Sequence, residues 1–170
     1  MKNTVLKYGL IGGIIVSLFM VISIPFMDEN TDMGNAELLG YATMIVSLST
    51  IYIGIRSYRN TVLNGTISFG NAFKIGLYIA LIASTLYVVT WMILSEFFIP
   101  EFIETYWNSA VEKLNASGMS QAEIDQEMES MKSMMELYKN PFFKFLITYM
   151  EILPVGVLIS LISAFILKKK

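Results

Sequence analysis

The sequence contains no cysteine and no histidine. Without cysteine there is no disulfide framework and no thiolate ligand, and without histidine there is no imidazole base and no histidine-containing zinc site. Charged residues are also scarce, at 15% of the 170 residues, where soluble domains carry roughly 25%. Together with a hydrophobic content of 55% and a mean hydropathy of +0.59, this scarcity predicts an integral membrane protein.

Four long apolar runs are separated by polar connections. A helix needs about 20 apolar residues to cross a hydrocarbon core of roughly 30 Å, because every backbone amide inside lipid must be bonded within its own segment. The runs predict an all-α protein, a bundle of four transmembrane helices at residues 8–27, 38–55, 75–95 and 145–167. The first run is too long for a secretory signal core and no cleavage pattern follows it. We therefore expect residues 1–170 to form a single membrane domain.

Basic and acidic residues separate between the connections. The N-terminus, the 56–74 connection and the C-terminus hold basic residues and no acidic one: Lys2, Lys7, Arg56, Arg59, Lys74, Lys168, Lys169 and Lys170. The connection after the first run holds only acids, namely Asp28, Glu29, Asp32 and Glu37. The segment between the third and fourth runs is also mainly acidic. Because flanking Lys and Arg are retained in the cytoplasm, both termini are predicted to be cytoplasmic.

The connection between the third and fourth runs is too long for a simple turn. Pro100, followed by two acidic residues, is typical of a helix start, and Gly118 is typical of a helix end. Ser120 and Glu123 match a capping box, after which apolar residues recur four and three positions apart. We therefore expect a helical hairpin over residues 100–139, inserted in the membrane domain on the extracytoplasmic side.

Several short motifs are similar to one known family. They lie at residues 7–11, at 67–70 and 72–74 before the third run, at 138–141, and at 151–156 in the fourth run. On these motifs the chain resembles the bacterial family called domain of unknown function 4199, over nearly its whole length. The resemblance implies a small multi-pass protein of the bacterial inner (cytoplasmic) membrane. It implies no activity and no catalytic residue.

Glu151 and Pro154, in the fourth run, are candidate functional residues. A carboxylate at the centre of a membrane helix costs about 2.5–3.5 kcal/mol and marks a candidate site. Glu151 is either structural, stabilised by a backbone carbonyl or by Lys144 two turns away, or a proton- or cation-linked site between helices. Pro154 is expected to kink the helix over residues 150–154. That kink is either a hinge or only a packing shape.

Small residues recur at every fourth position in three of the runs. Such residues let the backbones of membrane helices approach closely, although the spacing could also arise by chance. We expect the first, third and fourth runs to pack through these series: Gly9, Gly13 and Ser17; Ala72, Gly76, Ala80 and Ser84; and Gly156, Ser160 and Ala164.

Methionines cluster in the predicted hairpin, at Met119, Met128, Met131, Met134 and Met135. They either pack the hairpin or, as soft thioether ligands, bind an ion such as Cu(I). Because no histidine or cysteine reinforces such a site, we expect no metal and no cofactor.

The motifs of several functions are missing from the sequence. There is no glycine-rich phosphate loop and no paired nucleophile and base, so we expect no enzyme. The basic residues Arg56, Arg59 and Lys74 are interpreted as contacts with the membrane surface, so we expect no nucleic-acid binding. The leading prediction is a non-enzymatic membrane scaffold or accessory subunit that presents the acidic hairpin, residues 100–139, to an envelope partner. The alternative is a small oligomeric transporter with Glu151 and Pro154 at its moving part. The bilayer is a partner in both cases, and a homo-oligomer remains an open alternative.

Overall fold

A computed structural model of the chain describes residues 1–23 and 33–169, without the side chains at positions 33, 34, 36, 37, 102 and 103. The predicted end of the first span at residues 24–27, the acids Asp28, Glu29 and Asp32, and Lys170 lie outside the described residues. In the described part, the secondary structure is helical, apart from one isolated backbone bridge. The predicted all-α fold is confirmed.

In the described residues, four candidate spans are long and apolar enough to cross a membrane, as the sequence predicts. They are α1 (Lys2–Ser23), α2 (Met33–Leu48) with α3 (Thr50–Thr61), α4 (Phe69–Phe97) and α7 (Pro141–Leu167). The helices α1, α4 and α7 begin before the predicted apolar runs. N-caps explain the starts of α4 and α7. Ser68 Oγ accepts a hydrogen bond from the Asn71 amide (3.4 Å), and Asn140 Oδ1 accepts one from the Phe142 amide (2.9 Å).

The second candidate span, Leu38–Thr61, consists of two helices that meet at Ser49. Ser47 Oγ donates to the Met44 carbonyl (3.0 Å), Ser49 Oγ to Val46 (2.6 Å) and Thr50 Oγ1 to Ser47 (2.7 Å). Hydroxyls that bond to nearby carbonyls compete with the helix ladder and often bend it. The interruption at Ser49 is therefore explained by this run of hydroxyl residues.

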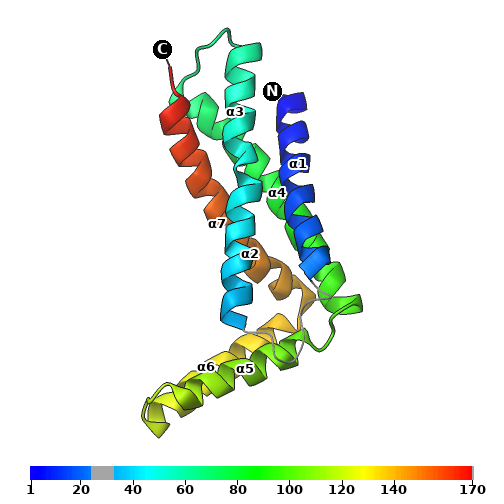
Figure 1. Ribbon diagram of the computed structural model, residues 1–170, viewed down its shortest axis with the longest axis vertical. Coiled ribbons are helices and arrows are strands. Elements are labelled where there is room, and N and C mark those ends of the chain that lie inside the picture. The colour runs from blue at the N-terminus through cyan, green and yellow to red at the C-terminus, as the bar shows by residue number, and fades with distance from the viewer. Residues whose placement is uncertain (24–32, 170) are drawn as a thin grey trace.

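The helix α4 is the centre of the bundle, with its most extensive contacts to α7 and α1 (Figure 1). The core is made of aliphatic side chains that are almost fully buried, among them Leu48, Ile51, Ile55, Ile75, Ile79 and Ile152. The outward faces also carry large apolar side chains, and Ile22, Leu158 and Phe165 are each more than half exposed. So much exposed apolar surface is unfavourable in water and is typical of helices that face lipid.

Both described ends of the chain and the α3–α4 connection lie at one end of the bundle (Figure 1). The C-terminal tail is fixed there, because the backbones of Ile67 and Lys169 exchange two hydrogen bonds of 2.9 Å. In addition, Arg59 Nη1 donates to the Leu167 carbonyl at 3.2 Å. We call this the basic end, because it gathers the basic residues of the two termini and of the α3–α4 connection.

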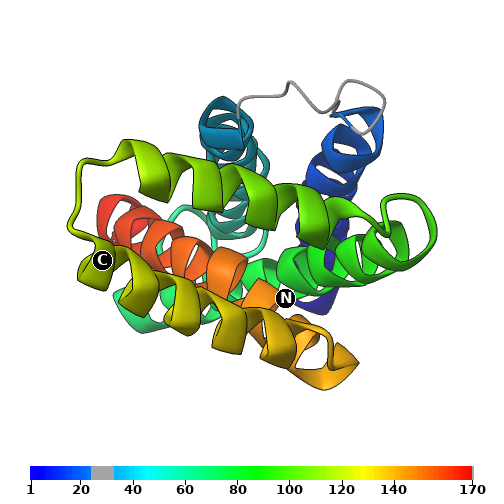
Figure 2. The same cartoon turned by 90° about the horizontal axis from the view of Figure 1, so that it is seen from below.

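The helices α5 (Phe102–Ala116) and α6 (Gln121–Tyr138) lie at the opposite end of the bundle. Seen from below, they run side by side in opposite directions and cross that end of the bundle (Figure 2). Gly118, with a φ of 73°, lies in the turn between them. The left-handed backbone there favours glycine. The side of the membrane on which this hairpin lies stays a prediction.

Candidate functional site

Glu151 lies at the surface of the bundle, next to the contact between α7 and α4. Glu151 is exposed, and its Oε1 accepts a long hydrogen bond of 3.4 Å from the hydroxyl of Tyr87. Tyr87 itself is buried. Two shallow grooves of the described chain lie elsewhere, at the basic end. The structure thus places Glu151 beside a buried hydroxyl at the α4–α7 contact, away from these grooves.

Pro154 lies one turn beyond Glu151 and is also exposed. The helix α7 continues through it, from Pro141 to Leu167. Because proline has no N–H, the bond that residue 154 would donate to the Met150 carbonyl cannot form. A hinge at this point stays a prediction.

Lys144 is a buried cation near the start of α7. Lys144 is only 5% exposed. Its ammonium lies 3.4 Å from Ser95 Oγ and 3.6 Å from Glu96 Oε2. Buried charges require partners, because leaving water is costly. In the structure Lys144 forms an ion pair with Glu96 on α4. Its contact with Glu151, which the sequence offers as one alternative, stays a prediction.

The end of α6 is held by an aromatic pair. The indole N–H of Trp91 on α4 donates to the hydroxyl of Tyr138, the last residue of α6. The ring of Tyr138 also lies 5.7 Å from the Lys144 ammonium, within the range of a cation–π contact. Burial raises the pKa of Tyr138 above its ordinary value, more than its hydrogen bonds with the side chains of Trp91 and Thr148 lower it. The phenol therefore stays neutral over the physiological range.

We call these residues the anchor cluster: Trp91, Ser95, Glu96, Tyr138, Lys144 and Thr148. The cluster joins α6 to two candidate spans, α4 and α7, and Thr148 Oγ1 completes it by donating to the Lys144 carbonyl at 2.8 Å. Sequence reasoning misses it as a group. The sequence signal that points to the cluster is a pair of charges beside the apolar runs. Lys144 lies near the start of the fourth run, and Glu96 lies at the end of the third.

The small-residue series lie at contacts between helices. Gly9 and Gly13 of α1 are buried against Ile82 and Leu86 of α4, where an added Cβ would lie 2.7 and 2.4 Å from their side chains. Ser17 accepts a hydrogen bond of 2.9 Å from Thr90 on α4. These close approaches leave no room for larger side chains on α1.

The α4 and α7 series face each other. A Cβ added at Gly76 would lie 2.9 Å from Ser160 Oγ, and one added at Gly156 would lie 2.8 Å from Ala80 Cβ. Ala72, Ser84 and Ala164 are also buried. Two further glycines, not singled out from the sequence, make equally close contacts: Gly12 against Thr50 and Gly54 against Ile79.

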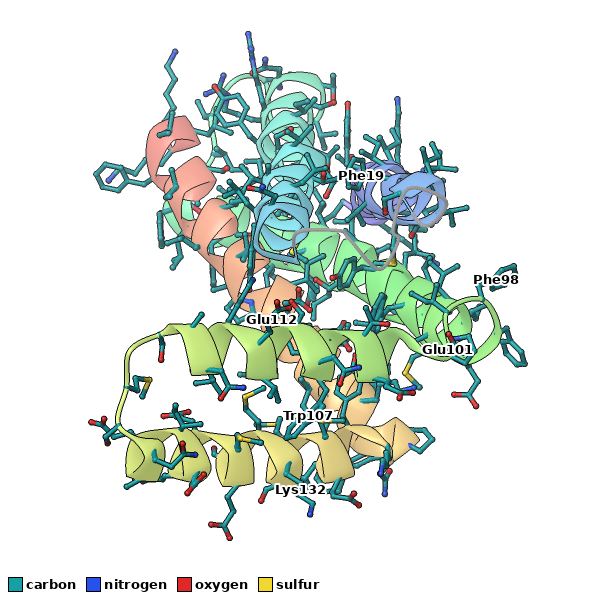
Figure 3. All side chains as sticks on the ribbon, turned by 60° about the horizontal axis from the view of Figure 1, so that its bottom comes forward. Phe19, Phe98, Glu101, Trp107, Glu112 and Lys132 are labelled. Carbon is teal, nitrogen blue, oxygen red and sulfur yellow. The ribbon has the colours of Figure 1, made fainter. Side chains whose placement is uncertain are left out.

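The hairpin presents carboxylates to its surroundings. All eight acids of α5, α6 and their flanks are exposed: Glu101, Glu104, Glu112, Glu123, Asp125, Glu127, Glu129 and Glu136. Figure 3 shows Trp107 between the two helices, and Lys132 on the outer side of α6. Met128, Met131 and Met135 are partly buried, whereas Met119 and Met134 are exposed. Three of the five methionines therefore contribute to packing of the hairpin, and two lie on its surface.

The described residues include four candidate membrane spans whose outer faces carry large exposed apolar side chains. Residues 7–169 match the family described as "Protein of unknown function (DUF4199)", and the chain belongs to this family. The predicted resemblance is thus confirmed. Comparison with curated proteins and with solved structures finds no match.

Proposed function

We propose that the chain is a non-enzymatic membrane scaffold or accessory subunit that presents the α5–α6 hairpin to a basic surface of an envelope protein. The observation that carries the proposal is the anchor cluster, in which Trp91 and Lys144 hold the end of α6 against two spans. A fixed hairpin loses less conformational entropy on binding than a free one.

The charge of the hairpin determines the partner chemistry. Eight exposed carboxylates stand against three lysines, Lys113, Lys132 and Lys139. Complementary charge increases the rate of encounter and selects against acidic partners. A partner with a basic face is therefore the class that the hairpin fits.

Site-specific photocrosslinking in native membranes tests the proposal. A photoreactive residue at position 112 or 127, both exposed on the hairpin, is expected to capture the same protein. A probe at Val62, exposed at the basic end, is the matched control. The double variant Glu127→Lys/Glu129→Lys is expected to give no adduct. Crosslinking of the wild type at high salt is also expected to give none, because salt screens the charges. An adduct that is unchanged by the charge reversal, or that also forms from position 62, would contradict the proposal, as would the absence of any adduct.

A second candidate is a small oligomeric transporter with a proton-linked Glu151 and a hinge at Pro154. The observation in its favour is the hydrogen bond of Tyr87 to a carboxylate within a candidate span. Under this candidate, Glu151→Gln abolishes proton flux into vesicles that contain the protein, while Glu104→Gln does not. Equal flux in the wild type and in protein-free vesicles would exclude it.

A further inference from the structure

Two apolar grooves lie at the basic end of the bundle, on either side of α4. The first, of about 340 Å³, runs between α1 and α4 and is lined by Val5, Leu6, Leu81 and Ile82, with Lys2 at its edge. The second, of about 330 Å³, lies between Phe69 of α4 and the side chains Leu161, Ile162 and Phe165 of α7. Both grooves are on the surface that faces lipid if the four helices cross a membrane.

A lysine stands at each groove. Lys2 belongs to the lining of the first. At the second, the Lys168 ammonium lies 4.2 Å from the centroid of the Phe165 ring, one of the lining side chains. The tail that carries Lys168 is fixed by the backbone pairing of Lys169 with Ile67. Each site thus combines a shallow apolar groove with an ammonium group at the same end of the molecule.

The surrounding charge is of one sign. The two termini and the connection at residues 56–74 contain no acidic residue, so no Asp or Glu side chain of these segments competes for the lysines. A second copy of the chain that docked through the same end would bring like charges together, which is unfavourable. A phospholipid has the complementary chemistry, since its acyl chain fits an apolar groove and its phosphate fits an ammonium group.

We propose that these two grooves are binding sites for anionic phospholipids. In each, an acyl chain occupies the groove and the anionic headgroup contacts the lysine, Lys2 or Lys168. Each lysine near an anionic headgroup region contributes about fivefold in affinity, which corresponds to about 1 kcal/mol. The inference is independent of the hairpin's proposed role, because it concerns the opposite end of the molecule.

Lipid retention tests the headgroup part of the proposal. The full chain is purified in detergent with equal amounts of phosphatidylglycerol and phosphatidylcholine of matched acyl chains, and the retained lipids are counted by native mass spectrometry. The wild type is expected to enrich phosphatidylglycerol, and Lys2→Gln and Lys168→Gln each to weaken phosphatidylglycerol binding at its own groove about fivefold. The double variant is expected to lose more of the total enrichment than either single variant. Lys132→Gln, an exposed lysine on α6 at the far end, is the control. Equal retention of both lipids by the wild type, or an equal loss in the control, would overturn the proposal.

Filling a groove tests the acyl-chain part. Leu6→Trp and Ile162→Trp occupy the first and second groove, and each is expected to remove one retained phospholipid. Ile14→Trp is the matched control, because Ile14 is exposed on α1 and does not line the first groove. If neither groove variant changes retention while the lysine variants do, lipids contact the basic end only through their headgroups and the groove sites are refuted.

Discussion

The Lys144 ammonium lies 3.6 Å from Glu96 Oε2, yet the two side chains differ widely in exposure, at 7% and 66%. The pair joins the end of α4 to the start of α7. A cation that is nearly enclosed thus has its counter-charge at the surface, where water also reaches it. The two partners should therefore respond differently to replacement.

Replacing Glu96 is expected to be more destabilising than replacing Lys144. Glu96→Gln leaves a buried ammonium without its counter-charge, whereas Lys144→Met puts an apolar side chain of similar length among buried neighbours. Because Glu96 is largely exposed and screened by water, we expect the first change to lower the free energy of unfolding by only about 1 kcal/mol. Denaturant unfolding in detergent measures both, with Glu104→Gln as an exposed control. A larger loss for Lys144→Met than for Glu96→Gln would contradict this account of the pair.

The bond between Trp91 and Tyr138 is expected to hold the base of the hairpin. Trp91→Phe removes the indole donor and leaves the Tyr138 hydroxyl without it, which costs about 0.5–1.5 kcal/mol. The loss should be local, with faster hydrogen exchange at backbone amides 130–139 and little change in α1. Tyr149→Phe is a matched control, because its hydroxyl bonds Thr85 and the Leu81 carbonyl within the α4–α7 contact. Equal acceleration of exchange at 130–139 in both variants would show that the effect is not specific to the hairpin.

The four candidate spans can be predicted from the sequence because their cause is local. A run such as residues 75–95 must be a helix if it crosses lipid, since each backbone amide needs a partner within its own segment. The starts of α4 and α7 are less predictable, because Ser68 and Asn140 extend these helices past the apolar runs. The interruption at Ser49 is also missed, because the hydroxyls that cause it are common inside membrane helices.

The anchor cluster could not be predicted, because its contacts join residues far apart in the chain. Trp91 and Tyr138 are separated by 47 positions, and their meeting depends on the path of α5 and α6 between them. Lys144 illustrates the same limit. Its spacing from Glu151 on α7 indicates a common face, but the choice of Glu96 as ion-pair partner depends on how α4 packs against α7.

The close contact of α4 and α7 at Gly76 is expected to tolerate no larger side chain. An added Cβ there would lie 2.9 Å from Ser160 Oγ and 3.1 Å from Ile51 Cγ2. We expect Gly76→Leu to lower the free energy of unfolding by about 1–3 kcal/mol, the usual cost of overpacking. Gly40→Leu is the control, since nothing lies within 4 Å of a Cβ at Gly40. Unchanged stability of Gly76→Leu in a thermal unfolding series would mean that the two helices can separate at this point without cost.

The start of α6 is expected to be sensitive to acid. Glu123 Oε2 accepts from the Ser120 hydroxyl (2.7 Å) and from the Ser120 amide (2.9 Å), and these bonds lower the pKa of Glu123 below its ordinary value of 4.5. A carboxylate whose pKa is lowered by folding contributes stability above the unfolded pKa, and that contribution is lost as the pH falls through the folded pKa. Protection of the first α6 amides from exchange, corrected for the intrinsic rate, should therefore decrease below pH 4.5.

The variant Glu123→Ala isolates this carboxylate. It is expected to show weak protection of the first α6 amides at neutral pH, because the capping box is lost, and little further change on acidification. Glu127→Ala, which removes an exposed acid one turn later, should keep the wild-type pH profile. If Glu123→Ala loses protection with acid as steeply as the wild type does, the acid sensitivity of α6 arises from other carboxylates of the hairpin and the cap at Ser120 does not control it.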